Sequence, residues 1–234
     1  MNSTALLAAE KICKDYPTPE GPISVLKGVD FSLLEGEIAF ITGRSGSGKS
    51  TFLHLAGGLY RVTEGRIFFK GSDLSQMNEK ELALYRNRKI GFIFQFFHLL
   101  PELTLFENVL LPTLMAHSPN AGRVRELIRR VGLRGREDHF PAELSGGEQQ
   151  RAAIARALVN DPEIVFCDEP TGNLDDETAN MVFNLLEELH RERGMSLVIV
   201  THDEGRARRY QKVYRLRDGL IQLDTLRGEM SHGA

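Results

Sequence analysis

The segment from Gly43 to Ser50 has the residue types and the spacing that hold a chain of phosphate groups. It runs Gly-Arg-Ser-Gly-Ser-Gly-Lys-Ser, which fits the pattern G-x-x-x-x-G-K-[ST] throughout. Glycines let the backbone curl so that successive N–H groups point at phosphate oxygens, and the N-terminus of a following helix adds the positive end of its dipole. Lys49 is expected to reach the β- and γ-phosphates, and the Ser50 hydroxyl is expected to take a place on Mg²⁺.

An acidic pair follows the apolar run Ile164–Cys167. Such a run is typical of a buried parallel strand, so its end is expected beside the phosphate loop. Asp168 would there orient the ligand shell of Mg²⁺, and Glu169 could polarise a water for in-line attack on the γ-phosphate. By itself, an Asp-Glu pair after a core strand is more often simply solvated, but the phosphate loop favours the catalytic interpretation.

His202 follows a third apolar run, Leu197–Val200. An isolated histidine at the end of a strand is more often a structural hydrogen-bond partner than a catalyst. This one is expected at the same sheet edge as Asp168, where ligands of open α/β sheets bind. It is therefore a candidate for contacting the γ-phosphate and holding the attacking water.

The elements that must position these residues alternate between short strands and helical patterns, which indicates a layered α/β fold. Asn78 and Glu81 form a plausible helix start before Leu82–Lys89, and Asp218-Gly219 indicates a tight terminal hairpin. Residues 104–160 are predicted to be almost wholly helical, with interruptions at Pro112, Ser118–Pro119 and Ser145–Gly147. The strands are expected at Leu6–Cys13, Val25–Leu33, Ile38–Ile41, Gly65–Phe69, Ile90–Phe94, Ile164–Cys167, Leu197–Val200 and Val213–Leu216, and helices at Ser50–Leu59 and Glu148–Val159.

The composition narrows the class of protein. The chain has 234 residues, 41% of them hydrophobic, with 29 Lys+Arg against 32 Asp+Glu for a formal net charge of −3. This excludes a generally basic nucleic-acid binder, and the two distant cysteines argue against a disulfide framework. No apolar run approaches the roughly 20 residues that span a bilayer, and Met1–Glu10 lacks the pattern of a signal peptide. We expect a chain that reaches a membrane only through a partner.

Leu144-Ser145-Gly146-Gly147-Glu148-Gln149 places free backbone N–H groups at the start of a second helix. Together with the other motifs in their order, this segment resembles the signature motif of ATP-binding cassette (ABC) ATPases. The resemblance covers about Leu6 to Leu223. It implies a P-loop NTPase (RecA-like) α/β core with an antiparallel β part and an inserted α-helical subdomain. We expect a single domain over residues 1–234, with residues 1–91 and 160–234 as the core and 92–159 as the helical signature subdomain.

The resemblance implies roles for further residues. Tyr16 matches the aromatic residue that stacks on adenine, and Gln95 matches the glutamine that links the Mg²⁺ and water site to the helical subdomain. Asp175 matches a residue at the dimer interface, within Gly172-Asn173-Leu174-Asp175. The expected catalytic residues are Glu169, as general base, and His202. The expected ATP-binding residues are Tyr16, Gly43, Arg44, Ser45, Gly46, Ser47, Gly48, Lys49, Ser50, Thr51 and Gln95, and the expected Mg²⁺ ligands are Ser50, Gln95 and Asp168.

The family pattern also implies a head-to-tail dimer, because ATP lies between the phosphate loop of one copy and the signature of the other. Ser145, Gly146, Gly147 and Glu148 would complete the partner's site. Separate transmembrane permease subunits would dock near Phe96–Glu107. This stretch is apolar and aromatic, and the sequence leaves open whether it is exposed or core.

Within the family, three segments resemble the lipoprotein-releasing LolD-type ATPases. They are Phe52–Leu59, Gln95–Thr104 and Asp168–Asp175. This resemblance implies an ATPase on the cytoplasmic face of the bacterial inner membrane, held there peripherally, which powers lipoprotein release towards the outer membrane. Export of drugs or peptides through a MacB-type partner and FtsE-type signalling to cell-wall hydrolases remain alternatives. A soluble DNA-repair or translation ATPase is disfavoured, since there is no long heptad pattern and no second cassette.

Overall fold

The computed structural model describes residues 5–224, so the expectations for the two ends of the chain, 1–4 and 225–234, lie outside the described residues. The chain divides into two compact units. The first comprises the chain up to Gln76 and again from Val198, and the second is Met77–Leu197. Strand β8 (Ser196–Thr201), which is buried throughout, crosses the boundary.

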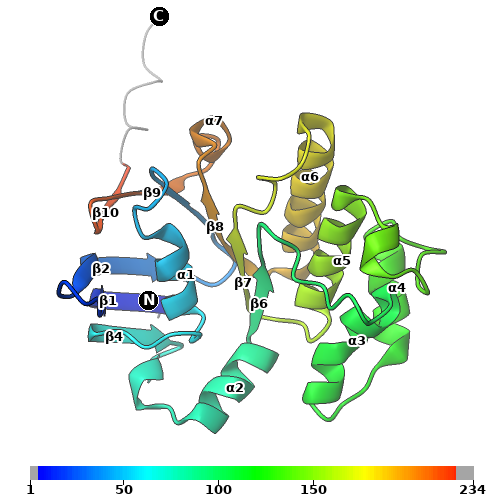
Figure 1. The fold of residues 1–234 in the computed structure, drawn as a ribbon, viewed down its shortest axis with the longest axis horizontal. Coiled ribbons are helices and arrows are strands. Elements are labelled where there is room, and N and C mark those ends of the chain that lie inside the picture. Colours follow the sequence, from blue (N-terminus) through cyan, green and yellow to red (C-terminus); the bar gives the residue numbers. More distant parts are fainter. Residues whose placement is uncertain (1–4, 225–234) are drawn as a thin grey trace, which may run out of the picture. The chain divides into compact units, whose positions relative to one another are not determined.

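The first unit contains an antiparallel sheet in the order β2-β1-β4-β5 (Figure 1). Its strands are β1 (Leu7–Tyr16), β2 (Ile23–Leu33), β4 (Glu64–Phe69) and β5 (Ser72–Asp73). From Val29 to Leu33 buried and solvent-facing residues alternate, with Val29, Phe31 and Leu33 inside, whereas Leu26 is buried on the other side of a register shift. This period of two places one face on the core, as expected for an antiparallel sheet covered on one side.

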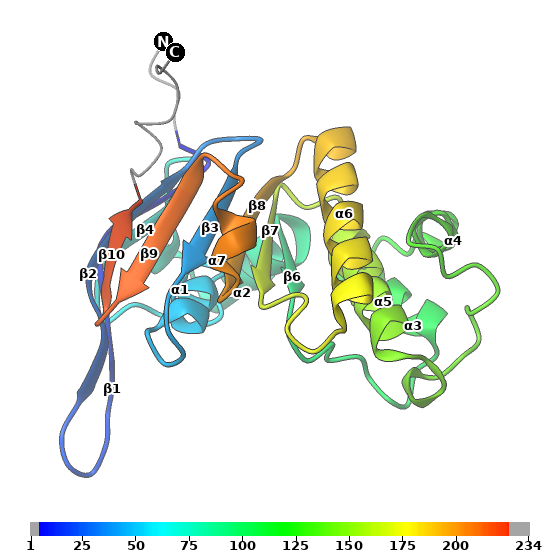
Figure 2. The same cartoon turned by 90° about the horizontal axis from the view of Figure 1, so that it is seen from above.

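The first unit also contains the strand that leads into the phosphate loop. This strand, β3 (Ile38–Thr42), pairs in parallel with β9 (Lys212–Arg217), which turns back at the predicted Asp218-Gly219 hairpin into β10 (Leu220–Leu223) (Figure 2). Helix α1 (Lys49–Ala56) begins directly after the loop and buries Phe52 and Leu53. The edge-to-face contact between Phe52 and Phe31, with ring centroids 4.9 Å apart, packs α1 against the antiparallel sheet. A 3-10 turn, Leu74–Gln76, and the short helix α7 (Glu204–Ala207) complete this unit.

The second unit pairs β6 (Ile90–Ile93) in parallel with β7 (Ile164–Asp168), includes the start of β8, and is mostly helical elsewhere. Helix α5 packs against α3, α4 and α6, and Figure 2 shows these helices side by side. The predicted start of α2 is confirmed, because Asn78 and Glu81 form a capping box there. The helices are α2 (Glu79–Arg88), α3 (Leu105–Met115), α4 (Ala121–Arg130), α5 (Gly146–Leu158) and α6 (Asp176–Arg193), with a 3-10 turn at Pro141–Glu143.

Three helix predictions were wrong in detail. Helix α1 ends at Ala56, where Gly57 forms the C-cap, rather than at Leu59. Pro112 does not interrupt the helical stretch but lies inside the last turn of α3, where its carbonyl accepts hydrogen bonds from the amides of Asn87 and Asn160. Helix α5 begins at Gly146 rather than at Glu148, because Ser145 caps its N-terminus. The two signature glycines therefore belong to the first turn of the helix.

A buried amide fixes the loop before α3. Asn108 accepts a hydrogen bond from Leu100 N–H (2.8 Å) and donates to the carbonyls of Leu100, Leu103 and Thr104 (2.9–3.0 Å). A buried amide with both of its ends bonded gives the loop a single conformation.

None of the helices in residues 5–224 has both the length and the hydropathy that a membrane-spanning helix needs.

Candidate functional site

The phosphate loop of the first unit connects β3 to α1, as the sequence predicts. Its last glycine, Gly48, has φ +104° and sits at the N-cap of α1, a conformation that side-chain-bearing residues rarely adopt. The side chain of Lys49 is buried, and its Nζ donates to the carbonyls of Gly43 (2.9 Å) and Arg44 (3.0 Å). The ammonium group is thus held at the loop itself, in position for a phosphate chain.

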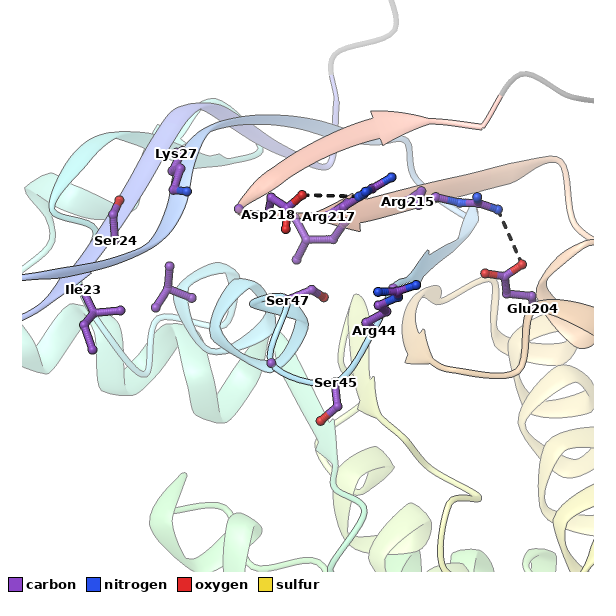
Figure 3. A pocket seen from close by; sticks show the side chains of 15 residues that line it. Ile23, Ser24, Lys27, Arg44, Ser45, Ser47, Glu204, Arg215, Arg217 and Asp218 are labelled. Atoms are coloured by element: carbon purple, nitrogen blue, oxygen red, sulfur yellow. Dashed lines mark hydrogen bonds and ion pairs between the residues drawn. The ribbon is translucent and has the colours of Figure 1, made fainter.

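A cavity of about 610 Å³ lies beside this loop (Figure 3). Four basic and two acidic side chains line it, so its charge suits a polyphosphate. They are Lys27, Arg44, Arg215 and Arg217 against Glu204 and Asp218. In addition, the buried hydroxyl oxygen of Ser47 has no hydrogen-bond partner among the described residues. A hydroxyl carries a donor, so this orphaned group fits a phosphate oxygen as its partner.

Two other predicted residues belong to the same unit. Tyr16 ends β1, is half-buried, and has the Nζ of Lys14 5.1 Å from its ring centroid. Its ring therefore already takes part in a cation–π contact and keeps an accessible surface. His202 follows β8 and is exposed, at the turn whose next residue, Asp203, caps α7.

The predicted acidic pair lies in the second unit, where Asp168 ends β7 and both carboxylates are half-buried. Glu169 has φ +47°, an unusual backbone conformation for a non-glycine residue. Its carbonyl accepts the N–H of Gly172 (3.0 Å), which closes the turn after the strand. Residues other than glycine that have a strained backbone conformation cluster at functional sites.

Gln95 is linked to the loop after the acidic pair by two reciprocal hydrogen bonds. Its amide nitrogen donates to Asn173 Oδ1, and Asn173 Nδ2 donates to the Gln95 carbonyl, both at 3.1 Å. The structure therefore brings Gln95 and the Gly172–Asp175 loop together within one unit. Asp175 itself caps α6, where the N–H of Thr178 donates to its carboxylate (2.9 Å) and holds its pKa below the ordinary value.

The signature lies at the N-terminus of α5 in a reciprocal capping box. The Glu148 N–H donates to the Ser145 hydroxyl (3.3 Å), and the Ser145 N–H donates to the Glu148 carboxylate (2.8 Å). That second bond, aided by Arg136 at 3.3 Å, holds the pKa of Glu148 below its ordinary value. The Ser145 hydroxyl uses an acceptor lone pair in the cap, so its proton stays available to an anion beyond the helix end.

The predicted site residues thus fall into two sets. One set, in the first unit, comprises the phosphate loop with Tyr16 and His202, and the other, in the second unit, comprises Gln95, the acidic pair, the signature and Asp175. Among the described residues, no group of three or more His, Cys, Asp or Glu gathers as a metal site. The predicted Mg²⁺ set has only one carboxylate, which suits an ion held mostly by phosphate oxygens and water.

Sequence reasoning missed side chains that organise the second set. Asn173 lies in the Gly172–Asp175 motif without a predicted role, and the sequence predicts no role for Gln150 or Arg156 of α5. The signal that could have found Gln150 is its position on the buried stripe of α5, between Gly147 and Ile154. A long amide on an otherwise apolar helix face must find partners inside the protein.

The sequence matches the ABC transporter family over residues 26–172, more than half of the chain. The chain therefore belongs to this family and is an ATPase. Two dimeric structures of the ATP-binding cassette MJ0796, one of them a post-hydrolysis state bound to ADP and Pi, resemble it with a TM-score of 0.87. They are 39% identical to it, over 95% of this chain and 99% of theirs. The predicted fold class is confirmed.

The resemblance to LolD-type ATPases is also confirmed. The chain is 48% identical over 224 residues to the lipoprotein-releasing system ATP-binding protein LolD of Geobacter metallireducens. The aligned residues cover 94% of this chain and 100% of that protein. It is 45% identical over 220 residues to LolD of Idiomarina loihiensis, over 93% and 96% of the two chains.

The first turn of α5 offers a test of its packing. A Cβ at Gly147 would lie 2.4 Å from Thr178 Cγ2, so Gly147→Ala should lower the free energy of unfolding by about 1–2 kcal/mol. In a Thr178→Ser background the obstructing methyl group is gone. There the same change should be neutral or stabilising, because alanine favours a helix over glycine by up to about 1 kcal/mol. Denaturant unfolding of the four chains measures this, and an equal effect in both backgrounds would contradict the contact.

Proposed function

We propose that this chain is the ATP-hydrolysing subunit of a membrane complex that releases lipoproteins from the bacterial inner membrane towards the outer membrane. The observation that carries the proposal is the nearly full-length similarity to LolD proteins, in a chain that retains the phosphate loop, acidic pair and capped signature. It would act at the cytoplasmic face of that membrane, held there by its partner subunits.

Most of the groups that bind the nucleotide belong to the first unit, and Gln95 and Asp168 belong to the second. The N–H groups of the loop at Gly43–Gly48 donate hydrogen bonds to phosphate oxygens, and Lys49 neutralises charge on the β- and γ-phosphates. Thr51 follows the loop on α1, and Tyr16 stacks on the adenine. Ser50, Gln95 and Asp168 would hold Mg²⁺, which neutralises charge on the phosphates when it is bound.

The second unit supplies the base. Glu169 takes a proton from a water molecule while the oxygen of that water attacks the γ-phosphorus. The bond from the γ-phosphorus to the bridging oxygen breaks, leaving ADP and phosphate. His202 contacts the γ-phosphate and orients the water. Gln95 would link the Mg²⁺ and water site to the helical subdomain. We place this subdomain at residues 92–159, between the core segments 1–91 and 160–234.

Two copies are needed to complete the sites. In the proposed head-to-tail dimer, the N-terminus of α5 in one copy offers its N–H groups and the Ser145 hydroxyl to the γ-phosphate held by the other copy. Gly146 and Gly147 keep that surface free of side chains, Glu148 braces it, and Asp175 lies at the interface. Loss of the γ-phosphate on hydrolysis removes the group that both copies bind, so the dimer opens.

The permease subunits are proposed to dock on the second unit near Phe96–Glu107. Part of this stretch is exposed, since Phe96 shows 66% and Leu100 42% of its surface. A nearby cavity of about 320 Å³ is lined by Phe94, Met115 and Arg156, among others, and Met115 is itself 68% exposed. Exposed apolar residues beside a cavity are typical of a surface that a partner covers.

The base assignment predicts the behaviour of Glu169→Gln. The amide keeps the shape of the side chain but cannot accept the proton, so turnover should fall by about 100-fold or more while ATP binding persists. Steady-state hydrolysis and nucleotide binding measure the two effects, and the copies should remain associated in ATP. Glu188→Gln, the same chemical change at an exposed position of α6, is the control and should hydrolyse ATP normally. Wild-type turnover by Glu169→Gln would refute the base.

The assignment to lipoprotein release is tested by the cargo. The complex is purified with its membrane partner from cells that produce Glu169→Gln, which should arrest the cycle, and bound material is identified by mass spectrometry. Acylated lipoproteins should be enriched over a Glu188→Gln preparation. A cell-wall hydrolase regulator without cargo, or a drug or peptide in place of lipoprotein, would contradict the proposal.

A further inference from the structure

A buried glutamine of α5 reaches two backbone segments that are far apart in the sequence. Gln150 has no exposed surface, and its amide nitrogen donates to the carbonyl of Phe94 (3.4 Å) and to the carbonyl of Pro170 (2.5 Å). Both acceptors are carbonyl oxygens, so the atom facing them must be the nitrogen and not the oxygen of the amide. One side chain thus joins the end of β6 to the turn after β7.

The residues beside these two carbonyls are the ones to which catalytic and nucleotide-sensing roles are assigned. Phe94 directly precedes Gln95, and Pro170 directly follows Glu169, whose backbone is in the left-handed conformation with φ +47°. A donor shared between the neighbouring carbonyls fixes the backbone from which both side chains project. Since Gln150 belongs to α5, the same bonds connect that backbone to the helix that begins at the signature.

A second side chain of α5 extends this connection. Arg156 donates to the carbonyls of His98 (2.5 Å) and Phe97 (2.8 Å), and His98 also has a positive φ of +48°. The segment on both sides of Gln95 is therefore held from α5, by an amide on one side and by a guanidinium on the other. By contrast, the Oε1 atom of Gln150 is buried and has no hydrogen-bond partner among the described residues. Leaving such an acceptor unsatisfied costs stability, so the bonds that this side chain contributes are those of its donor.

We propose that Gln150 is a positioning residue for hydrolysis, which holds Gln95 and Glu169 in register with each other and with the signature helix. The proposal rests on the roles given above to Gln95 and Glu169. Gln150 acts through the backbone and belongs to the second unit, whereas the phosphate loop belongs to the first. Its loss should therefore lower kcat much more than it raises KM for ATP, because misplacement of reacting groups by about an ångström costs up to about 100-fold in rate.

Two substitutions at this position separate positioning from packing. Gln150→Met keeps the length and volume of the side chain but has no donor, so kcat should fall by about 10-fold or more, with KM within about threefold. Gln150→Glu places a carboxylate against two carbonyls, and burial raises the pKa of such a group. Its neutral form carries one O–H donor. The kcat of Gln150→Glu, relative to wild type, should therefore rise as the pH falls from about 8.5 to about 6, whereas the relative kcat of Gln150→Met should stay flat.

The matched control is Asn108→Ala. It removes another buried amide of the second unit that bonds several backbone carbonyls, but these lie in the loop before α3. Steady-state kinetics and denaturant unfolding of the full chain compare the three variants. The proposal expects Asn108→Ala to lose stability at a nearly unchanged kcat.

Three results would overturn the proposal: a kcat of Gln150→Met within about twofold of wild type, an equal loss of kcat in Asn108→Ala, or a pH-independent relative kcat of Gln150→Glu. The proposed function fails separately, through normal turnover by Glu169→Gln. If Glu169→Gln is inactive and Gln150→Met keeps its activity, Glu169 is supported as the base and the positioning role of Gln150 is rejected.

Discussion

A polyphosphate can be held only where enough hydrogen-bond donors and positive charge converge, and we propose that this chain meets that constraint with the N-termini of two helices. Helix α1 follows the phosphate loop, with Gly48 in a left-handed conformation and Lys49 bonded to the loop carbonyls. Helix α5 begins at the signature, where Ser145 and Glu148 cap it. Backbone donors and a helix dipole bind phosphate without any special side chain, so the sequence around both ends is dominated by glycine and serine.

Except for His202, the residues proposed to act on the bound nucleotide are arranged by the second unit. Gln95 is bonded reciprocally to Asn173, Glu169 lies in a turn closed by Gly172, and Asp175 caps α6. Helix α5 packs among α3, α4 and α6 and reaches the backbone beside Gln95 and Glu169 through Gln150. A single helix thus begins at the signature and, through Gln150, bonds the backbone beside Glu169, the proposed base. This gives a physical route by which engagement of the signature could affect hydrolysis.

Local patterns were sufficient to predict most strands, the start of α2 and the terminal hairpin, because each depends on short-range periodicity, capping or turn chemistry. The prediction for Pro112 was wrong because a proline usually ends or kinks a helix, whereas here the amides of two distant residues donate to its carbonyl. Gln150 and Arg156 escaped prediction because their acceptors are backbone carbonyls 20 to 59 positions away, and carbonyls carry no sequence signal. Side-chain-to-backbone contacts at long range are what the structure adds.

We propose that each ATP site is completed by two copies, with the phosphate loop of one copy and the signature of the other. Mixing two inactive chains tests this most directly. Lys49→Ala disables the loop, and Gly146→Asp sets a negative charge at the signature, at a position where a Cβ meets its nearest neighbours at an acceptable 3.7 Å. In a symmetric head-to-tail dimer the mixed pair has one intact site, so an equal mixture should recover about a quarter of wild-type ATP hydrolysis. A mixture no more active than the sum of the separate chains would contradict the account.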